Sequence, residues 1–118
     1  MTSNARILRL RLDEAAIALH SANHATFGAT IAVPEAYDLV GTLDQLVHRL
    51  PQLLGYLGRS VTHSPGWYFD DRGRDPSAAR TEAAHALDAA TGGIDLVSVQ
   101  LTAAHNALSH IGRHLPED

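Results

Sequence analysis

Residues 76–114 read PSAARTEAAHALDAATGGIDLVSVQLTAAHNALSHIGRH, and this stretch decides the fold. Apolar residues recur in it every seven positions, in two rows that interleave at steps of three and four: Leu87, Ile94, Leu101 and Leu108, and Ala83, Ala90, Val97, Ala104 and Ile111. This heptad spacing is typical of a long helix that packs along its length against another helix. Gly92-Gly93 interrupts the stretch, at a propensity cost of roughly 1 kcal/mol per glycine. Because both rows keep their phase across the glycines, we expect one helix over about residues 76–114.

Two further stretches have helical spacing. Over about residues 4–27, apolar positions follow one another at steps of four and three, as on one helical face: Leu8, Leu12, Ala15, Leu19 and Ala22. Pro34 suits the first turn of a second helix. The main row of that helix keeps its phase across Pro51 and is widened by a second row: Leu39, Leu43, Leu46, Leu50, Leu53 and Leu57, then Val40, Val47, Leu54 and Val61.

These patterns predict an all-α antiparallel bundle of three long helices within a single domain spanning residues 1–118. A four-helix bundle is the alternative if the last helix breaks at Gly92-Gly93. The third helix is the longest of the three, so part of its apolar row extends past its neighbours. An exposed row of this kind needs a partner, and we expect a homodimer that forms through the helical rows.

Composition excludes several classes of protein. With 118 residues, 45% of them apolar and 19% charged, the chain matches a globular domain and not a disordered segment. A net charge of −4 gives no general attraction to nucleic acid, so no nucleic-acid partner is expected. The apolar runs are too short to span a membrane and the first residues do not match a signal peptide, which predicts a cytoplasmic protein. Cysteine is absent, so there is neither a disulfide nor a thiolate zinc site.

Histidines occur in pairs four residues apart in the first and third predicted helices, and carboxylates begin the second: His20 and His24, His110 and His114, Glu35 and Asp38. An up-down-up bundle brings these three helix ends together, and imidazole with carboxylate suits zinc or a similar divalent metal. On a helical wheel, however, both pairs lie away from the apolar rows, as solvated side chains do. Eight histidines and no lysine also fit the composition that a GC-rich genome produces. We therefore expect no cofactor and keep a metal site as the alternative.

Residues 62–75, with the sequence THSPGWYFDDRGRD, form the only long irregular segment that the sequence predicts. A loop of this length in a small domain is uncommon and is often functional. We predict that it contacts another protein through its aromatic and charged side chains: Trp67, Tyr68, Phe69, Asp70, Asp71, Arg72 and Arg74. The alternative is that Trp67 and Phe69 cover the open end of the bundle while the charges face water.

Arg80 and His85 fit the Arg-x4-His motif of the HEPN ribonucleases, in which these two residues act together on RNA across a dimer interface. A step of five places the two side chains about 140° apart on a helix, which weakens the match. The sequence thus favours a non-enzymatic helical protein–protein interaction or accessory protein. A metal binder or metal-dependent enzyme, and a HEPN-like ribonuclease, are the alternatives.

Three stretches of the chain resemble a known group of proteins: LRLDEAAIALH at 10–20, NHATFG at 23–28 and FDDRGRDP at 69–76. They are similar to small uncharacterised all-helical proteins of Streptomyces and related actinomycetes, which are classed as domains of unknown function. The resemblance spans most of the chain. It implies a helical fold and an actinobacterial composition, and it assigns no activity and no site residue.

Overall fold

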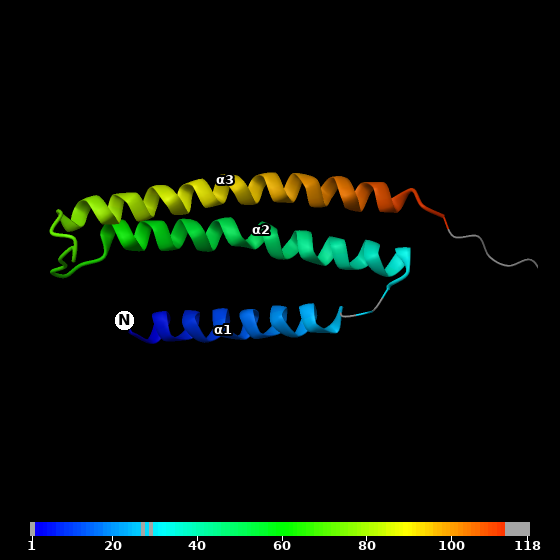
Figure 1. The fold of residues 1–118 in the computed structure, drawn as a ribbon, viewed down its shortest axis with the longest axis horizontal. Coiled ribbons are helices and arrows are strands. Elements are labelled where there is room, and N and C mark those ends of the chain that lie inside the picture. The colour runs from blue at the N-terminus through cyan, green and yellow to red at the C-terminus, as the bar shows by residue number, and fades with distance from the viewer. Residues whose placement is uncertain (1, 27, 29, 113–118) are drawn as a thin grey trace, which may run out of the picture. The chain divides into compact units, whose positions relative to one another are not determined.

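The computed structural model describes residues 2–26, 28 and 30–112, and the secondary structure within these ranges is entirely helical (Figure 1). Helix α1 spans Thr2–Ala25, α2 spans Val33–His63 and α3 spans Pro76–Ser109. The predicted all-α fold of three long helices is therefore confirmed. The chain divides into two compact units, Met1–Ala32 and Val33–Asp118. The second unit is the hairpin of α2 and α3.

Helix α3 begins at a capped end and continues through its glycine pair. The Asp75 carboxylate accepts a hydrogen bond from the backbone N–H of Ser77 at 3.0 Å, and Pro76 occupies the first turn. That N–H bond holds the pKa of Asp75 below its usual value. The helix then runs unbroken across Gly92-Gly93 to Ser109, so the alternative with a break at the glycines is wrong. Helix α2 likewise continues through Pro51.

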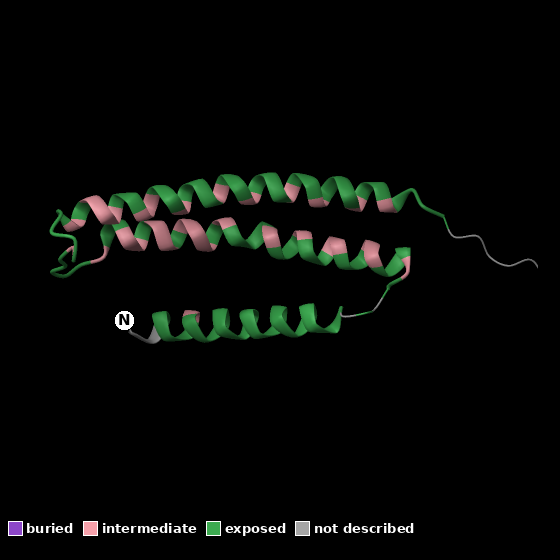
Figure 2. Cartoon of the chain, in the orientation of Figure 1, coloured by how far each residue is buried: buried purple, intermediate pink, exposed green. Residues whose placement is uncertain are grey.

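Helices α2 and α3 lie side by side and antiparallel, and half-buried residues line their facing sides (Figure 2). On α3 the facing residues include the predicted row Leu87, Ile94, Leu101 and Leu108, joined by Ala84, Thr91, Ser98 and His105. On α2 they are the residues predicted only to widen the main row: Val40, Val47, Leu54 and Val61, joined by Tyr37, Asp44, Pro51 and Gly58. The predicted main leucine row of α2 is therefore not the row that packs against α3.

Polar and aromatic contacts inside the hairpin set the alignment of the two helices. The Asp44 carboxylate accepts hydrogen bonds from Ser98 Oγ at 3.0 Å and from Thr102 Oγ1 at 3.1 Å. About two turns along α2 from Asp44, the rings of Tyr37 and His105 stack with their centroids 4.0 Å apart. His105 also lies against Gly41, where an added Cβ would come within 3.0 Å of the imidazole. Each contact fits one register only.

The hairpin leaves much apolar surface uncovered. No residue within the described ranges is fully buried. Leu39 and Leu46 of α2 are 57% and 56% exposed, and Leu96 of α3 is 71% exposed. None of the helices described is both long and apolar enough to cross a lipid bilayer. The hairpin therefore carries apolar side chains that its own two helices do not cover.

Two glycines of the hairpin predict opposite responses to alanine. Nothing lies within 4 Å of a Cβ added at Gly92, so Gly92→Ala gains the helix propensity of alanine and raises the free energy of unfolding by about 1 kcal/mol. Gly41→Ala gains the same propensity but pushes His105 off Tyr37, and we expect no net gain or a loss. Urea unfolding followed by circular dichroism measures both. Equal stabilisation by the two substitutions would contradict the close approach at Gly41.

Candidate functional site

The loop between α2 and α3 is held at its base by Tyr68. The Tyr68 hydroxyl donates to the carbonyl of Pro65 at 2.8 Å and lies 2.8 Å from Ser64 Oγ. Gly66 has a φ of 124°, a conformation that favours glycine, and a Cβ there would come within 3.3 Å of the Tyr68 hydroxyl. The Tyr68 ring also lies beneath the Arg80 guanidinium, 5.3 Å from its carbon. The Pro-Gly-x-Tyr sequence thus folds back on itself and fixes the start of the loop.

Arg80 joins this loop to the end of α2. Its guanidinium donates to the carbonyl oxygens of Val61 at 2.8 Å, Thr62 at 3.1 Å and Ser64 at 2.7 Å. The last carbonyls of a helix have no partner within the helix, and a cation there is also favoured by the helix dipole. A side chain from α3 therefore caps α2. Next to it lies an open hollow of about 370 Å³, lined by Leu57, Ser60, Val61, Ser64, Tyr68 and Arg80.

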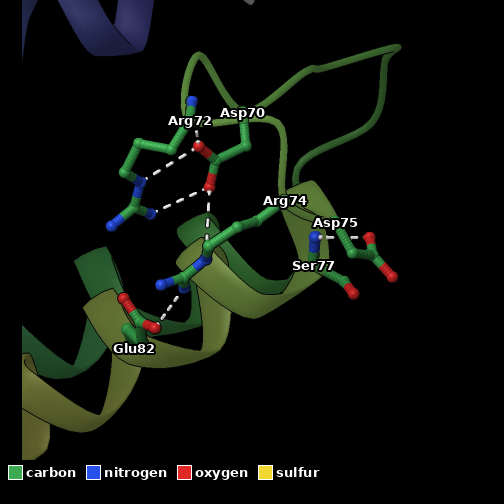
Figure 3. A network of polar contacts seen from close by, with 6 residues as sticks. All are labelled: Asp70, Arg72, Arg74, Asp75, Ser77 and Glu82. Carbon is green, nitrogen blue, oxygen red and sulfur yellow. Dashed lines mark hydrogen bonds and ion pairs between the residues drawn. The ribbon is translucent and has the colours of Figure 1, made fainter.

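The second half of the loop is organised around one carboxylate (Figure 3). Asp70 Oδ1 accepts from the backbone N–H of Arg72 at 2.7 Å and from its Nε at 3.0 Å, and Oδ2 pairs with the outer guanidinium nitrogen of Arg72 at 2.8 Å. Arg74 Nε lies 3.9 Å from the same carboxylate, and Arg74 also pairs with Glu82 on α3. Gly73, with a φ of 77°, closes the turn by donating to the Asp70 carbonyl. The side chain of Asp70 is only 2% exposed.

These contacts lower the pKa of Asp70 to about 2. The side-chain hydrogen bond from Arg72 is the largest cause, followed by the bond from the Arg72 backbone N–H, and the charges of Arg72 and Arg74 add to both. The same pairing raises the pKa of Arg72 above its usual value. The loop is thus fixed by an acid that stays ionised near neutral pH.

Trp67 and Phe69 project from this fixed loop into solvent. Trp67 is fully exposed and Phe69 is 87% exposed, whereas Tyr68 between them is drawn toward Arg80. Successive residues of an extended chain point to opposite sides, so anchoring Tyr68 turns both of its neighbours outward. The alternative that Trp67 and Phe69 cover the end of the bundle is therefore wrong for the α2–α3 hairpin. Asp71 is exposed as well.

A second surface runs along the hairpin, and we call it the open face. It consists of a leucine stripe on α2 and an alanine–valine stripe on α3: Leu39, Leu43, Leu46, Leu50, Leu53 and Leu57, and Ala83, Ala90, Val97, Ala104 and Ile111. Leu43 and Leu50 come one residue before the facing residues Asp44 and Pro51, just as Val97 comes one residue before Ser98. Because α2 and α3 are antiparallel, this equal shift turns both stripes to the same side of the hairpin.

The residues of the metal hypothesis are divided between the two units of the chain. His20 and His24 are exposed on α1, while Glu35, Asp38 and His110 are exposed in the other unit. His114 lies outside the described residues. No group of three or more histidine, aspartate or glutamate side chains within residues 2–26, 28 and 30–112 is placed to hold a metal ion. The metal site stays a prediction.

Two further groupings resemble catalytic motifs: Arg80 with His85, whose ribonuclease role stays a prediction, and Ser98 with His48 and Asp44. The Arg80 guanidinium is engaged by main-chain carbonyls, and His85 is exposed on the following turn of α3. Ser98 Oγ lies 3.1 Å from His48 Nδ1 and 3.4 Å from His48 Nε2, and Asp44 Oδ1 lies 3.3 Å from Nδ1. In a hydrolytic triad the serine donates to the imidazole, whereas here Ser98 Oγ donates directly to Asp44 Oδ1 at 3.0 Å. The Asp44 cluster therefore acts as a polar layer within the hairpin.

Sequence reasoning missed the roles of Asp44, His105 and Arg80. Asp44 and His105 stand at heptad positions, where a pattern of apolar residues alone gives no weight to polar ones. Arg80 lies seven residues before Leu87, which places it in the facing row of α3. Scoring polar residues by heptad position would have found all three.

Comparison with known proteins gives no match: no family model, no curated protein and no solved structure is significantly similar to this chain.

Protonation of Asp70 at low pH should weaken the contacts that hold the loop in place. Its pKa is about 2 in the folded chain against a usual 3.8, so the carboxylate stabilises the loop fully above about pH 4, and this contribution is lost as the pH falls toward 2. Trp67 is the only tryptophan, so its fluorescence anisotropy reports the mobility of the loop. We expect the anisotropy of the wild type to fall between pH 4 and pH 2, and Asp70→Asn to lower it above pH 4 and to approach the wild type as the pH falls to 2. Asp71→Asn serves as the control, and an Asp70→Asn variant that matches it would contradict the network.

Removing the cap on α2 should cost stability. Arg80→Ala leaves three carbonyls without their charged donor, and we expect the free energy of unfolding to fall by about 2 kcal/mol. Arg80→Lys should recover part of this, because one ammonium cannot reach all three oxygens with the same geometry. Arg49→Ala, at an exposed arginine of α2, should change the value by less than about 0.5 kcal/mol. Chemical denaturation compares the three, and a loss at Arg80 no larger than that at Arg49 would refute the role of the cap.

Proposed function

We propose that this chain is a non-enzymatic protein–protein interaction module that binds a partner through the tip of its α2–α3 loop. The observation that carries this proposal is the full exposure of Trp67 and the 87% exposure of Phe69 on a loop that is held in place by contacts of Tyr68, Asp70 and Arg80. Large aromatic side chains, tryptophan above all, dominate the binding energy of protein interfaces. Two such side chains exposed together form an apolar patch, and an exposed apolar patch marks an interaction site.

The order within the loop supports the proposal. Binding is weakened when a flexible segment must become ordered at the interface, and this loop is already ordered by Asp70, Tyr68 and Arg80. The fixed charges lie beneath the aromatic tip, where they act as its scaffold. Trp67 and Phe69 are thus presented ready to insert into a recess.

The charges of the loop indicate the kind of partner. Asp70 and Asp71 are offset by Arg72 and Arg74, so the tip has no net charge to attract a nucleic acid or an anionic surface. Exposed Arg72 and Asp71 beside the aromatics match the polar rim that surrounds the apolar centre of a protein interface. The fitting partner is a protein with an apolar recess that has polar groups of both signs at its edge.

Site-specific crosslinking in cells that produce the protein tests the proposal. A photoreactive phenylalanine analogue in place of Trp67 should crosslink the chain to one partner protein. The product is heavier than the chain alone, and mass spectrometry then identifies the partner. The same analogue in place of Tyr56, an exposed aromatic of α2, is the matched control and should not join to it. Trp67→Ala/Phe69→Ala should weaken binding to the purified partner by about 30-fold or more.

Two results would contradict the proposal. The first is that the analogue at position 67 forms no crosslinked product beyond that formed by the analogue at position 56. The second is that the Trp67→Ala/Phe69→Ala variant binds the partner as tightly as the wild type does.

A further inference from the structure

The open face of the hairpin is apolar, whereas the opposite side of the same hairpin is polar. The opposite side carries His48, Asp88, Asp95 and Thr102, and the Asp44 carboxylate reaches toward it. On the open face, by contrast, the leucine stripe and the alanine–valine stripe contain no charged residue. The side of a helical hairpin that faces water is polar, and a side without charge is covered in the assembled protein.

The hairpin leaves four members of its leucine stripe exposed: Leu39, Leu43, Leu46 and Leu50. Covering these side chains removes apolar surface from water, which favours an assembly in which another element packs on the open face.

The length of the open face selects its occupant. The alanine–valine stripe extends from Ala83 to Ile111, about 42 Å along α3. The main row of α1 extends only from Leu8 to Ala22, about 21 Å. Another hairpin of the same sequence presents a face of equal length and breadth.

We propose that two copies of this chain pair through their open faces, and that their two α2–α3 hairpins form a four-helix bundle. In this arrangement a twofold axis runs parallel to the helices, so that α2 of each copy packs antiparallel on α3 of the other. Large side chains then meet small ones, because α2 contributes leucines while α3 contributes mainly alanine, glycine and valine. The contacts of Asp44 and Gly58 with α3 place Leu50 at about the level of Gly93, so Leu50 packs over the partner's Gly93.

This pairing uses a different surface from the loop tip, and its test separates the two. Sedimentation of the wild-type chain should give twice 12.6 kDa. Leu46→Glu places a charge in the paired face and should raise the dimer dissociation constant by about a hundredfold or more, with its helical circular dichroism retained. Gln45→Glu, its exposed neighbour on the other side of α2, is the matched control and should stay dimeric. Trp67→Ala/Phe69→Ala should stay dimeric as well, whatever happens to partner binding.

Crosslinking decides the matter if Leu46→Glu fails to fold. The chain has no cysteine, so chains carrying Leu50→Cys can be mixed with chains carrying Gly93→Cys and oxidised. The proposal predicts a mixed disulfide dimer, with little product from either variant alone. A monomeric wild type, a dimer that withstands Leu46→Glu, or self-crosslinking of Leu50→Cys in place of the mixed product would each overturn the arrangement.

Discussion

Two helices that pack against each other can bury only the side chains that each turns toward the other. In the hairpin of α2 and α3 those positions are shared between apolar residues and polar ones such as Asp44 and Ser98. The leucine stripe therefore remains outside the contact, although it is the most regular apolar pattern of α2. This limit explains why no described residue is fully buried in a chain that is 45% apolar. A hairpin of this kind keeps its outer apolar side chains exposed unless a second layer packs on them.

The polar contacts within the hairpin fix the register of α2 against α3. Apolar rows repeat every heptad, so two of them can slide by seven residues with little change in packing. Asp44 opposes such a slip, because its carboxylate accepts from two hydroxyl groups in the observed register, those of Ser98 and Thr102. A slip by seven residues would place it opposite Thr91 and Asp95 or opposite His105 and Ser109, with one hydroxyl group in place of two. The alignment also brings Arg80 level with the end of α2, where it caps the helix and supports Tyr68.

The helices were predictable from the sequence, while the choice between their apolar rows was not. Heptad spacing indicated α3 across Gly92-Gly93 and α2 across Pro51, because phase survives both interruptions. Spacing cannot tell which of two apolar rows on one helix faces the nearer neighbour. In α2 the row that contains glycine and polar residues is the one that packs against α3, because Gly41 leaves room for His105 and Asp44 accepts a hydrogen bond from Ser98. The loop was predictable as a long irregular segment from its composition, and its role as a contact surface stays a prediction. The burial of Asp70 was not, because it depends on a turn that only the folded backbone reveals.

The central claim is that the core of this protein is completed by a second layer of helices from another copy. The dependence of the thermal midpoint on protein concentration tests it most directly, because only a transition that separates chains responds to concentration. The account predicts that the midpoint rises by about 3 °C for each tenfold increase in concentration, given the unfolding enthalpy of a dimer of this size. A midpoint that stays constant over a hundredfold range of concentration would contradict it.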